Sequence, residues 1–227
     1  MHYTNLQKGE LNETGPLHVI LVRHGQSINN VVEAEVGDTP EFYARRSTDP
    51  TLSALGHQQA TLLGSRLGEQ LREMAAAGKV QLTCSTMQRA LQTAYPLAMA
   101  LRQSVQVNPE LVERHGFFRS TDVSSTGAKA ARIPVAGPDR EGIAKRFPSY
   151  DVALVPRLAE AMAEDEAMAE ERAGRVAAAL HAEAYHDGAE RIVVIVSHCD
   201  FLGHLARALL TLNPRAADQV WFLVADG

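Results

Sequence analysis

Two short, almost unbroken apolar stretches constrain what this chain can fold into. Residues 17–22 read Leu-His-Val-Ile-Leu-Val, and residues 192–196 read Ile-Val-Val-Ile-Val. Runs of this kind, without the alternation of a half-exposed strand, are typical of parallel strands covered on both faces. Helical patterns lie between them, and alternating strands and helices indicate an α/β fold. We therefore predict a three-layer sandwich with a mainly parallel central sheet flanked by helices.

The remaining patterns fit one domain over residues 1–227. Ser53 is placed to cap a helix that runs to about Ala77, and Ser85 to Gln88 has the form of a capping box. Residues 114–150 are broken by Gly and Pro and are too long for a plain connector, so we predict an irregular cap insertion there. The other predicted elements are a loop or short helical insertion at 31–50, strands at 80–84, 104–107 and 220–224, and helices ending near 102 and spanning 157–186 and 201–212.

Composition excludes several classes of protein. The 227 residues carry a net charge of -5, which disfavours a nucleic-acid partner. Two cysteines, Cys84 and Cys199, are too few for a disulfide framework or a four-thiolate zinc site. The apolar stretches are too short to span a bilayer, and the first residues lack the apolar run of a signal peptide. We expect a cytoplasmic, reduced protein with no membrane partner, and the sequence leaves a homodimer open.

Ionisable residues follow the predicted strands at their carboxyl ends, where open parallel sheets bind ligands. Arg23 and His24 come after the first strand, and Arg89 comes one turn into the helix after the second. Glu113 follows the third strand, and His198 follows the apolar run 192–196. Arginine donates two parallel hydrogen bonds to phosphate, and helix N-termini favour anions. The pattern predicts that the two arginines and the two histidines converge on a phosphate group.

That phosphate is predicted to belong to the substrate. No glycine fingerprint for a dinucleotide follows the first strand, and the chain has no Walker-type loop, so we expect no bound cofactor. Asp200 and His204 share a helix face four residues apart, but two ligands do not make a metal site. We therefore predict no metal.

Several motifs, in order along the chain, resemble those of one family. They are Leu21 to Ser27 with Asn30, Leu52-Ser53 with Gly56 and Gln59-Ala60, Cys84 to Ala94, Glu113, Gly142 to Tyr150, and Ser197-His198. In these motifs the chain resembles the histidine phosphatase superfamily, which includes cofactor-dependent phosphoglycerate mutases and many phosphatases. The resemblance covers most of residues 17–212.

The resemblance implies a role for each catalytic residue. His24 is the expected nucleophile, forming a phosphohistidine. Arg23, Arg89 and His198 are expected to neutralise the phosphoryl oxygens, and Glu113 to protonate the leaving oxygen and then activate water. This chemistry needs neither metal nor cofactor. The expected substrate-binding residues are Asn30, Ser27, Cys199 and Arg114.

The phosphatase branch is favoured over the mutases. Mutases carry a Gly-Trp segment after the first motif, whereas the only tryptophan here is Trp221, and Gly116 stands where mutases place Tyr. We expect a histidine acid phosphatase-type phosphoric monoester hydrolase that acts on a small phosphorylated molecule. The alternatives are a mutase-type phosphotransferase and a non-catalytic member that binds a phospho-ligand or a partner protein.

Three individual residues have competing interpretations. Ser27 is as well suited to cap a helix as to bind a ligand. Cys199 is interpreted as a buried small residue, since free cysteines are usually buried. Glu110 lies in the same loop as Glu113 and is the competitor for the role of the acid.

Overall fold

The structure, a computed structural model, describes residues 17–120, 132–185, 191–212 and 220–223. The predicted cap insertion is therefore described except for 121–131, and the predictions for the N-terminal residues 1–16 lie outside the described part. The elements follow in the order β1 (Leu17–Arg23), α1 (Ile28–Val36), α2 (Pro40–Arg45), α3 (Ala54–Ala76), β2 (Val80–Cys84), α4 (Gln88–Leu101), β3 (Gln106–Val107), the 3-10 helix η1 (Pro109–Leu111), β4 (Phe118–Ser120), β5 (Arg132–Pro134), α5 (Arg140–Arg146), α6 (Glu166–Tyr185), β6 (Arg191–Ser197), α7 (Cys199–Leu212) and β7 (Val220–Leu223).

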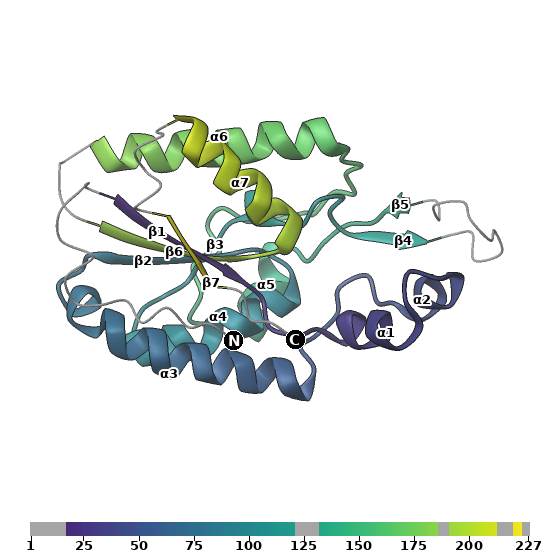
Figure 1. The fold of residues 1–227 in the computed structure, drawn as a ribbon, viewed down its shortest axis with the longest axis horizontal. Coiled ribbons are helices and arrows are strands. Elements are labelled where there is room, and N and C mark those ends of the chain that lie inside the picture. The colour runs from purple at the N-terminus through teal and green to yellow at the C-terminus, as the bar shows by residue number, and fades with distance from the viewer. Residues whose placement is uncertain (1–16, 121–131, 186–190, 213–219, 224–227) are drawn as a thin grey trace.

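A parallel sheet with the strand order β3-β2-β6-β1-β7 forms the middle layer. Helices α6 and α7 cover one face, and α3 and α4 cover the other (Figure 1). The three-layer sandwich predicted from the sequence is confirmed. Strands β1 and β6 are paired along their whole length, from Leu17 opposite Arg191 to Arg23 opposite Ser197. Their carboxyl ends therefore lie side by side.

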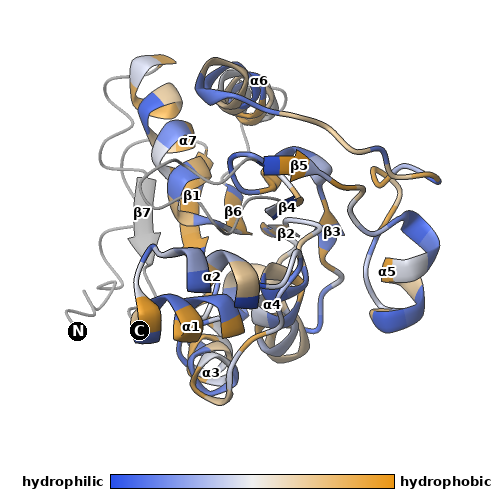
Figure 2. Ribbon diagram, turned by 90° about the vertical axis from the view of Figure 1, so that its right-hand side faces the viewer, coloured by the Kyte–Doolittle hydropathy of each residue, from blue (hydrophilic) through white to orange (hydrophobic). Residues whose placement is uncertain are grey.

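Burial on both faces explains why the strands are apolar throughout. In β1, Ile20 and Val22 belong to the core under α3 and α4, whereas Val19 and Leu21 belong to the core under α6 and α7. All four side chains are at most 3% exposed. Figure 2 shows β1 and β6 as hydrophobic strands between helices whose outer surfaces are mixed. A strand at the middle of the sheet has no polar face to present.

The short helical insertion predicted as one alternative for 31–50 corresponds to the end of α1 and to α2. Three predicted boundaries differ from the structure. The helix predicted over 201–212 begins at Cys199, and the predicted strand at 104–107 is reduced to the two residues of β3. The helix predicted over 157–186 begins only at Glu166. Asp165 caps this helix, because its carboxylate accepts the Met168 N–H and its carbonyl accepts the Ala169 N–H. Glu164 is thereby left outside the helix, where it makes contacts described below.

The insertion at 114–150 contains the antiparallel pair β4–β5 and helix α5. In Figure 1, β4 and β5 extend from the sheet on the side where α1 and α2 lie. Among the described helices, none combines the length and the apolar composition needed to cross a membrane.

Candidate active site

The predicted catalytic motifs meet at the carboxyl ends of β1, β2 and β6. The His24 N–H donates to the Ser197 carbonyl (3.0 Å), and the Ser85 N–H donates to the Val196 carbonyl (3.1 Å). These backbone bonds continue the sheet register by one residue beyond each strand. His24 and His198 are consequently neighbours, with ring centroids 5.1 Å apart and planes tilted by 56°.

His24 is held in one tautomer. Its Nδ1 lies 2.7 Å from the Gly25 carbonyl, which can only accept, so Nδ1 carries the proton. Its Nε2 accepts a hydrogen bond from Arg89 Nε at 3.0 Å. Burial, with the charges of Arg89 and Arg23, lowers the pKa of His24 to about 3. The imidazole is therefore neutral at physiological pH, and its lone pair is on Nε2, toward Arg89.

The tight turn after His24 depends on two glycines. A Cβ at Gly25 would lie 2.7 Å from the Gly56 carbonyl oxygen, and a Cβ at Gly56 would lie 2.0 Å from the Gln26 carbonyl oxygen. The backbone of the turn and the first turn of α3 thus approach more closely than any other residue type permits. The Ser53 hydroxyl caps α3 by accepting the Gly56 N–H and also donates to the Gln26 side chain. The predicted cap at Ser53 is confirmed.

Arg89 projects into the site from the first turn of α4. Burial lowers its pKa to about 10, although Glu113 and Asp49 oppose that fall. The capping box predicted at Ser85–Gln88 is wrong, because α4 begins at Gln88 and its N-cap Met87 offers no side-chain oxygen. The Gln88 N–H is accepted instead by the carboxylate of Asp49, from the loop after α2 (2.9 Å). That partner is 39 residues away in the chain, so local spacing did not reveal it.

His198 and Arg23 both present buried polar atoms without a partner among the described residues. His198 is fully buried, and its Nε2 lies 2.9 Å from the Ser85 hydroxyl, while Nδ1 has no partner. Arg23 Nε is likewise buried and unpaired. Burial, with the charge of Arg89, lowers the pKa of His198. Unsatisfied buried polar groups are costly, and their presence beside His24 is typical of a site built for a ligand.

Glu113 lies on the loop after η1 and is held against α7. Its Oε1 accepts the N–H of Arg114 (2.9 Å) and the N–H of Phe201 (3.0 Å), in the first turn of α7. Burial raises the pKa of Glu113, and Asp200 adds to that rise, while Arg89 opposes it. The competing Glu110 forms an exposed ion pair with Arg175 instead. Of the two acids, Glu113 is the one inside the site.

The predicted substrate-binding residues have other partners in the structure. Ser27 is the N-cap of α1, and Asn30 Oδ1 accepts both the N–H and the hydroxyl of Ser27, which completes a capping box. Arg114 donates to Asp200 at 2.8 Å and to Glu166 at 2.5 Å. The interpretation of Cys199 as buried is wrong. It opens α7, whose apolar side begins two residues later at Phe201, so Cys199 faces outward.

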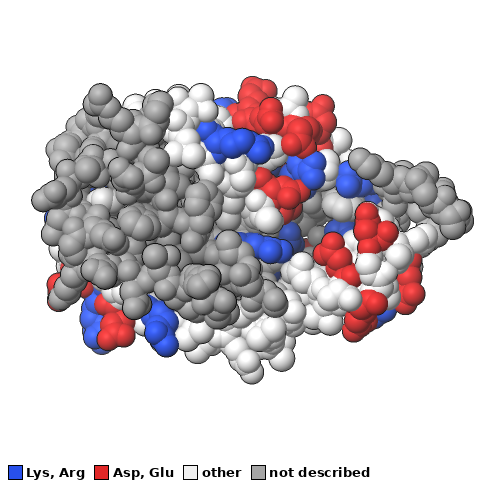
Figure 3. All heavy atoms as spheres, in the orientation of Figure 1, with Lys and Arg blue, Asp and Glu red and all other residues white. Residues whose placement is uncertain are grey.

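Two arginines near the site, Arg46 and Arg172, belong to none of the motifs that the sequence indicated. Arg46, at the end of α2, donates to the Phe118 carbonyl (2.9 Å) and stacks 3.9 Å above the Phe118 ring. The charge of Arg46 helps to lower the pKa of Arg89, so Arg46 adds to the positive potential of the site. Arg172, on α6, is buried beneath the Glu113 loop. Figure 3 shows Lys and Arg side chains around a hollow near the middle of this face, flanked by acidic groups.

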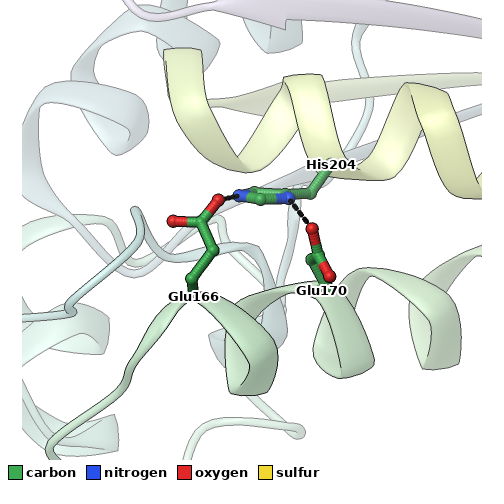
Figure 4. Close-up of side chains that lie close together, drawn as sticks. All are labelled: Glu166, Glu170 and His204. Carbon is green, nitrogen blue, oxygen red and sulfur yellow. Dashed lines mark ion pairs between the residues drawn. The ribbon is translucent and has the colours of Figure 1, made fainter.

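A second cluster of ionisable groups lies between α6 and α7. Figure 4 shows Glu166 and Glu170 on either side of the His204 ring, each facing a different ring nitrogen. The Arg207 guanidinium donates to His204 Nδ1 (2.7 Å), and Arg114 pairs with Glu166. The three side chains could approach a metal ion together. The two carboxylates face opposite nitrogens of the His204 ring, and Arg114 and Arg207 already pair with members of the cluster. We therefore assign the cluster as an ion-pair network.

The fold and the site define the class of this protein: an α/β sandwich whose strand ends hold paired histidines and arginines suited to a phosphoryl group. The family model described as histidine phosphatase superfamily (branch 1) matches residues 19–120. The resemblance to this superfamily that the motifs indicated is thereby confirmed. No curated protein sequence matches the chain significantly.

Solved structures with the same fold include an ecdysone phosphate phosphatase from Bombix mori in complex with tungstate. It is 19% identical, with a TM-score of 0.57, over 86% of this chain and 78% of that one. A mycobacterial glucosyl-3-phosphoglycerate phosphatase is 22% identical (TM-score 0.49; 87% and 81% covered). A putative alpha-ribazole-5'-P phosphatase from Escherichia coli is 19% identical (TM-score 0.49; 89% and 83% covered). At 19% identity, the likeness to the ecdysone phosphate phosphatase supports the fold of this chain and nothing beyond it.

Proposed function

We propose that this protein is a phosphomonoesterase that acts through a phosphohistidine on His24. The observation that carries the proposal is the hydrogen-bond geometry around this side chain. Its Nδ1–H is fixed on the Gly25 carbonyl, and its Nε2 keeps a lone pair beside Arg89, Arg23 and His198. A neutral, oriented imidazole surrounded by cationic donors is what attack on a phosphate dianion requires.

Substrate binding would first draw Arg89 from the nucleophile to the phosphate. In the free protein, Arg89 Nε donates to His24 Nε2 and blocks that lone pair. A phosphate dianion is the stronger acceptor, so the guanidinium would transfer its hydrogen bonds to phosphoryl oxygens. The unpaired Nε of Arg23 and Nδ1 of His198 supply further polar contacts. The same binding event thus frees the nucleophile and neutralises its target.

In the first chemical step, His24 Nε2 would form a bond to phosphorus while the bond from phosphorus to the leaving oxygen breaks. Glu113 would transfer its proton to that oxygen. Two N–H groups bind its Oε1, and no hydrogen bond within the described residues engages its Oε2, so we place the transferable proton on Oε2. The raised pKa of Glu113 favours the protonated form that a general acid needs.

In the second step, the Glu113 carboxylate would accept a proton from water as the water oxygen bonds to phosphorus and the nitrogen–phosphorus bond breaks. Inorganic phosphate leaves, and His24 and Glu113 return to their starting protonation states. Arg23 and Arg89 would provide the charge, and His198 a further hydrogen bond, where other phosphatases use a metal. We therefore propose that the reaction is metal-independent.

The test is phosphate release from p-nitrophenyl phosphate and from a panel of phosphorylated metabolites, sugars, nucleotides and phosphopeptides, in EDTA. We expect turnover at mildly acidic to neutral pH, and none for His24→Ala. Wild-type protein quenched without acid should carry a base-stable, acid-labile phosphate on His24. Absence of turnover on every substrate would favour a phospho-ligand-binding protein, and transfer to a second substrate rather than to water would favour a mutase.

A further inference from the structure

A buried ion pair that the proposed mechanism does not use lies directly beneath the Glu113 loop. Arg172, on α6, is 6% exposed, and its Nε and Nη2 donate to the two carboxylate oxygens of Glu164 at 2.7 and 2.8 Å. This is a bidentate pair between a buried arginine and a glutamate whose side chain is 11% exposed. Replacing both members of such a pair by neutral groups of similar volume often leaves the free energy of unfolding unchanged. A contribution to stability is therefore not a sufficient reason for this pair to be present.

The remaining contacts of this pair converge on Glu113 from three directions. On the near side, Arg172 Nη1 donates to the carbonyls of Glu110 (2.5 Å) and Val112 (3.0 Å), which precede Glu113. On the far side, Glu164 accepts the His115 N–H (3.3 Å), and its carbonyl contacts His115 Nδ1 (2.9 Å). The chain on both sides of Glu113 is therefore attached to one ion pair.

The third direction runs through Phe201. The Arg172 guanidinium lies 4.2 Å above the Phe201 ring, and the Phe201 N–H is one of the two donors to Glu113 Oε1. The ion pair thus also supports the residue that orients the carboxyl group. Few other groups could do this, because the planar fork of arginine is what reaches two carboxylate oxygens and two carbonyls at once.

From these contacts we propose that Arg172 and Glu164 are positioning residues that fix Glu113 for proton transfer to the leaving group. The inference rests on the proposed function and adds to it the part of the structure that aims the acid. It carries a specific consequence for the first chemical step, since a misplaced acid slows that step only where the leaving group needs its proton. Departure of an alkoxide needs that proton, whereas p-nitrophenolate leaves almost unaided.

The experiment compares two substrates in the double variant Arg172→Met/Glu164→Gln, which removes both charges while keeping volume. With an alkyl phosphate such as glycerol phosphate, we expect turnover to fall by ~10²-fold, the loss typical of a catalytic group displaced by about 1 Å. The burst of p-nitrophenol from p-nitrophenyl phosphate should change by less than about threefold, on the same reasoning. Arg175→Met is the matched control, because Arg175 lies on the same helix and its ion pairs with described residues, to Glu110 and Glu171, are exposed.

A double-mutant cycle with Glu113→Gln separates positioning from general damage. If Arg172 acts through Glu113, the double variant should have little further effect on alkyl phosphate turnover once Glu113 is Gln. Equal losses on both substrates in the burst phase, or losses that multiply with Glu113→Gln, would overturn the inference. If the double variant does not fold by circular dichroism, Arg172→Lys decides by the same criteria, since it keeps the charge and loses the fork. Wild-type protein that hydrolyses neither ester would overturn the proposed function first, and this inference with it.

Discussion

Arg89 is expected to destabilise the free protein while making it active, and Arg89→Met tests both effects. Burial lowers the pKa of Arg89 to about 10. Each pKa unit corresponds to about 1.36 kcal/mol, so this fall represents about 3 kcal/mol of disfavoured charge at neutral pH. The sign follows from the direction of the change. A cation whose pKa is lower in the folded state weakens the fold at every pH below that value.

The net gain from Arg89→Met should be smaller than this upper value. The side chain retains some exposure, which screens its charge, and the substitution also removes the hydrogen bond to His24 Nε2, worth about 1 kcal/mol. Methionine keeps most of the packing of the arginine stem. We therefore expect the free energy of unfolding at pH 7 to rise by ~1–2 kcal/mol, measured by urea denaturation with an unchanged m-value. Arg66→Met, at an exposed position on α3, is the control and should change stability by less than about 0.5 kcal/mol.

The same variant should lose activity. Removal of one preorganised donor to developing charge typically costs ~10²–10³ in kcat, and Arg89→Lys should restore activity only in part, because it lacks the planar fork. Added inorganic phosphate should stabilise the wild-type protein more than Arg89→Met. A loss of stability greater than about 1 kcal/mol in Arg89→Met would refute the reasoning, since it would mean that the cation is already compensated in the free fold.

Three further predictions follow from the same site. Because the pKa of His24 is lowered to about 3, the unfolded chain binds a proton at this residue between pH 6.5 and about 3 and the folded protein does not. The free energy of unfolding should therefore fall by up to about 1.36 kcal/mol per pH unit below pH 6.5, and its measured fall with pH should be less steep in His24→Gln. Glu113→Gln should slow alkyl phosphate turnover far more than the p-nitrophenol burst. In the wild type the rate of the first step should fall as pH rises through the raised pKa of Glu113, and this fall should be absent in the variant; an unchanged pH profile would count against this assignment. Gly56→Ala, whose Cβ would meet the Gln26 carbonyl at 2.0 Å, should cost more than ~2 kcal/mol by thermal or urea unfolding, whereas Gly174→Ala, which has open space on α6, should gain up to ~1 kcal/mol.

Much of the fold was predictable because it depends on patterns that are local in the chain. An apolar run such as 192–196 can be accommodated only where helices cover both faces of a strand, and β6 is the central strand of the sheet. The cap at Ser53 was predictable for the same reason, since its partner Gly56 is three residues away. Local spacing failed at Ser85, where the cap of α4 comes from a distant loop.

The meeting of His24, Arg89 and His198 was also predictable, because parallel strands deliver their carboxyl ends to one edge of the sheet. What lies around them was not. Whether Cys199 faces solvent or the core is set by where the apolar side of α7 begins, which one residue does not reveal.

The sequence by itself determined which residue types reach the strand ends, since that follows from the order of short motifs along the chain. Only the tertiary structure decided which of them are free to meet a phosphate. Arg114 is 86 residues from its partner Asp200, and Arg172 is 60 and 62 residues from the carbonyls it holds. Both are ordinary charged positions in the sequence. The physical reason is that an arginine is a ligand, a clamp or a solvated side chain according to the acceptors that folding places around it, and those acceptors come from distant segments.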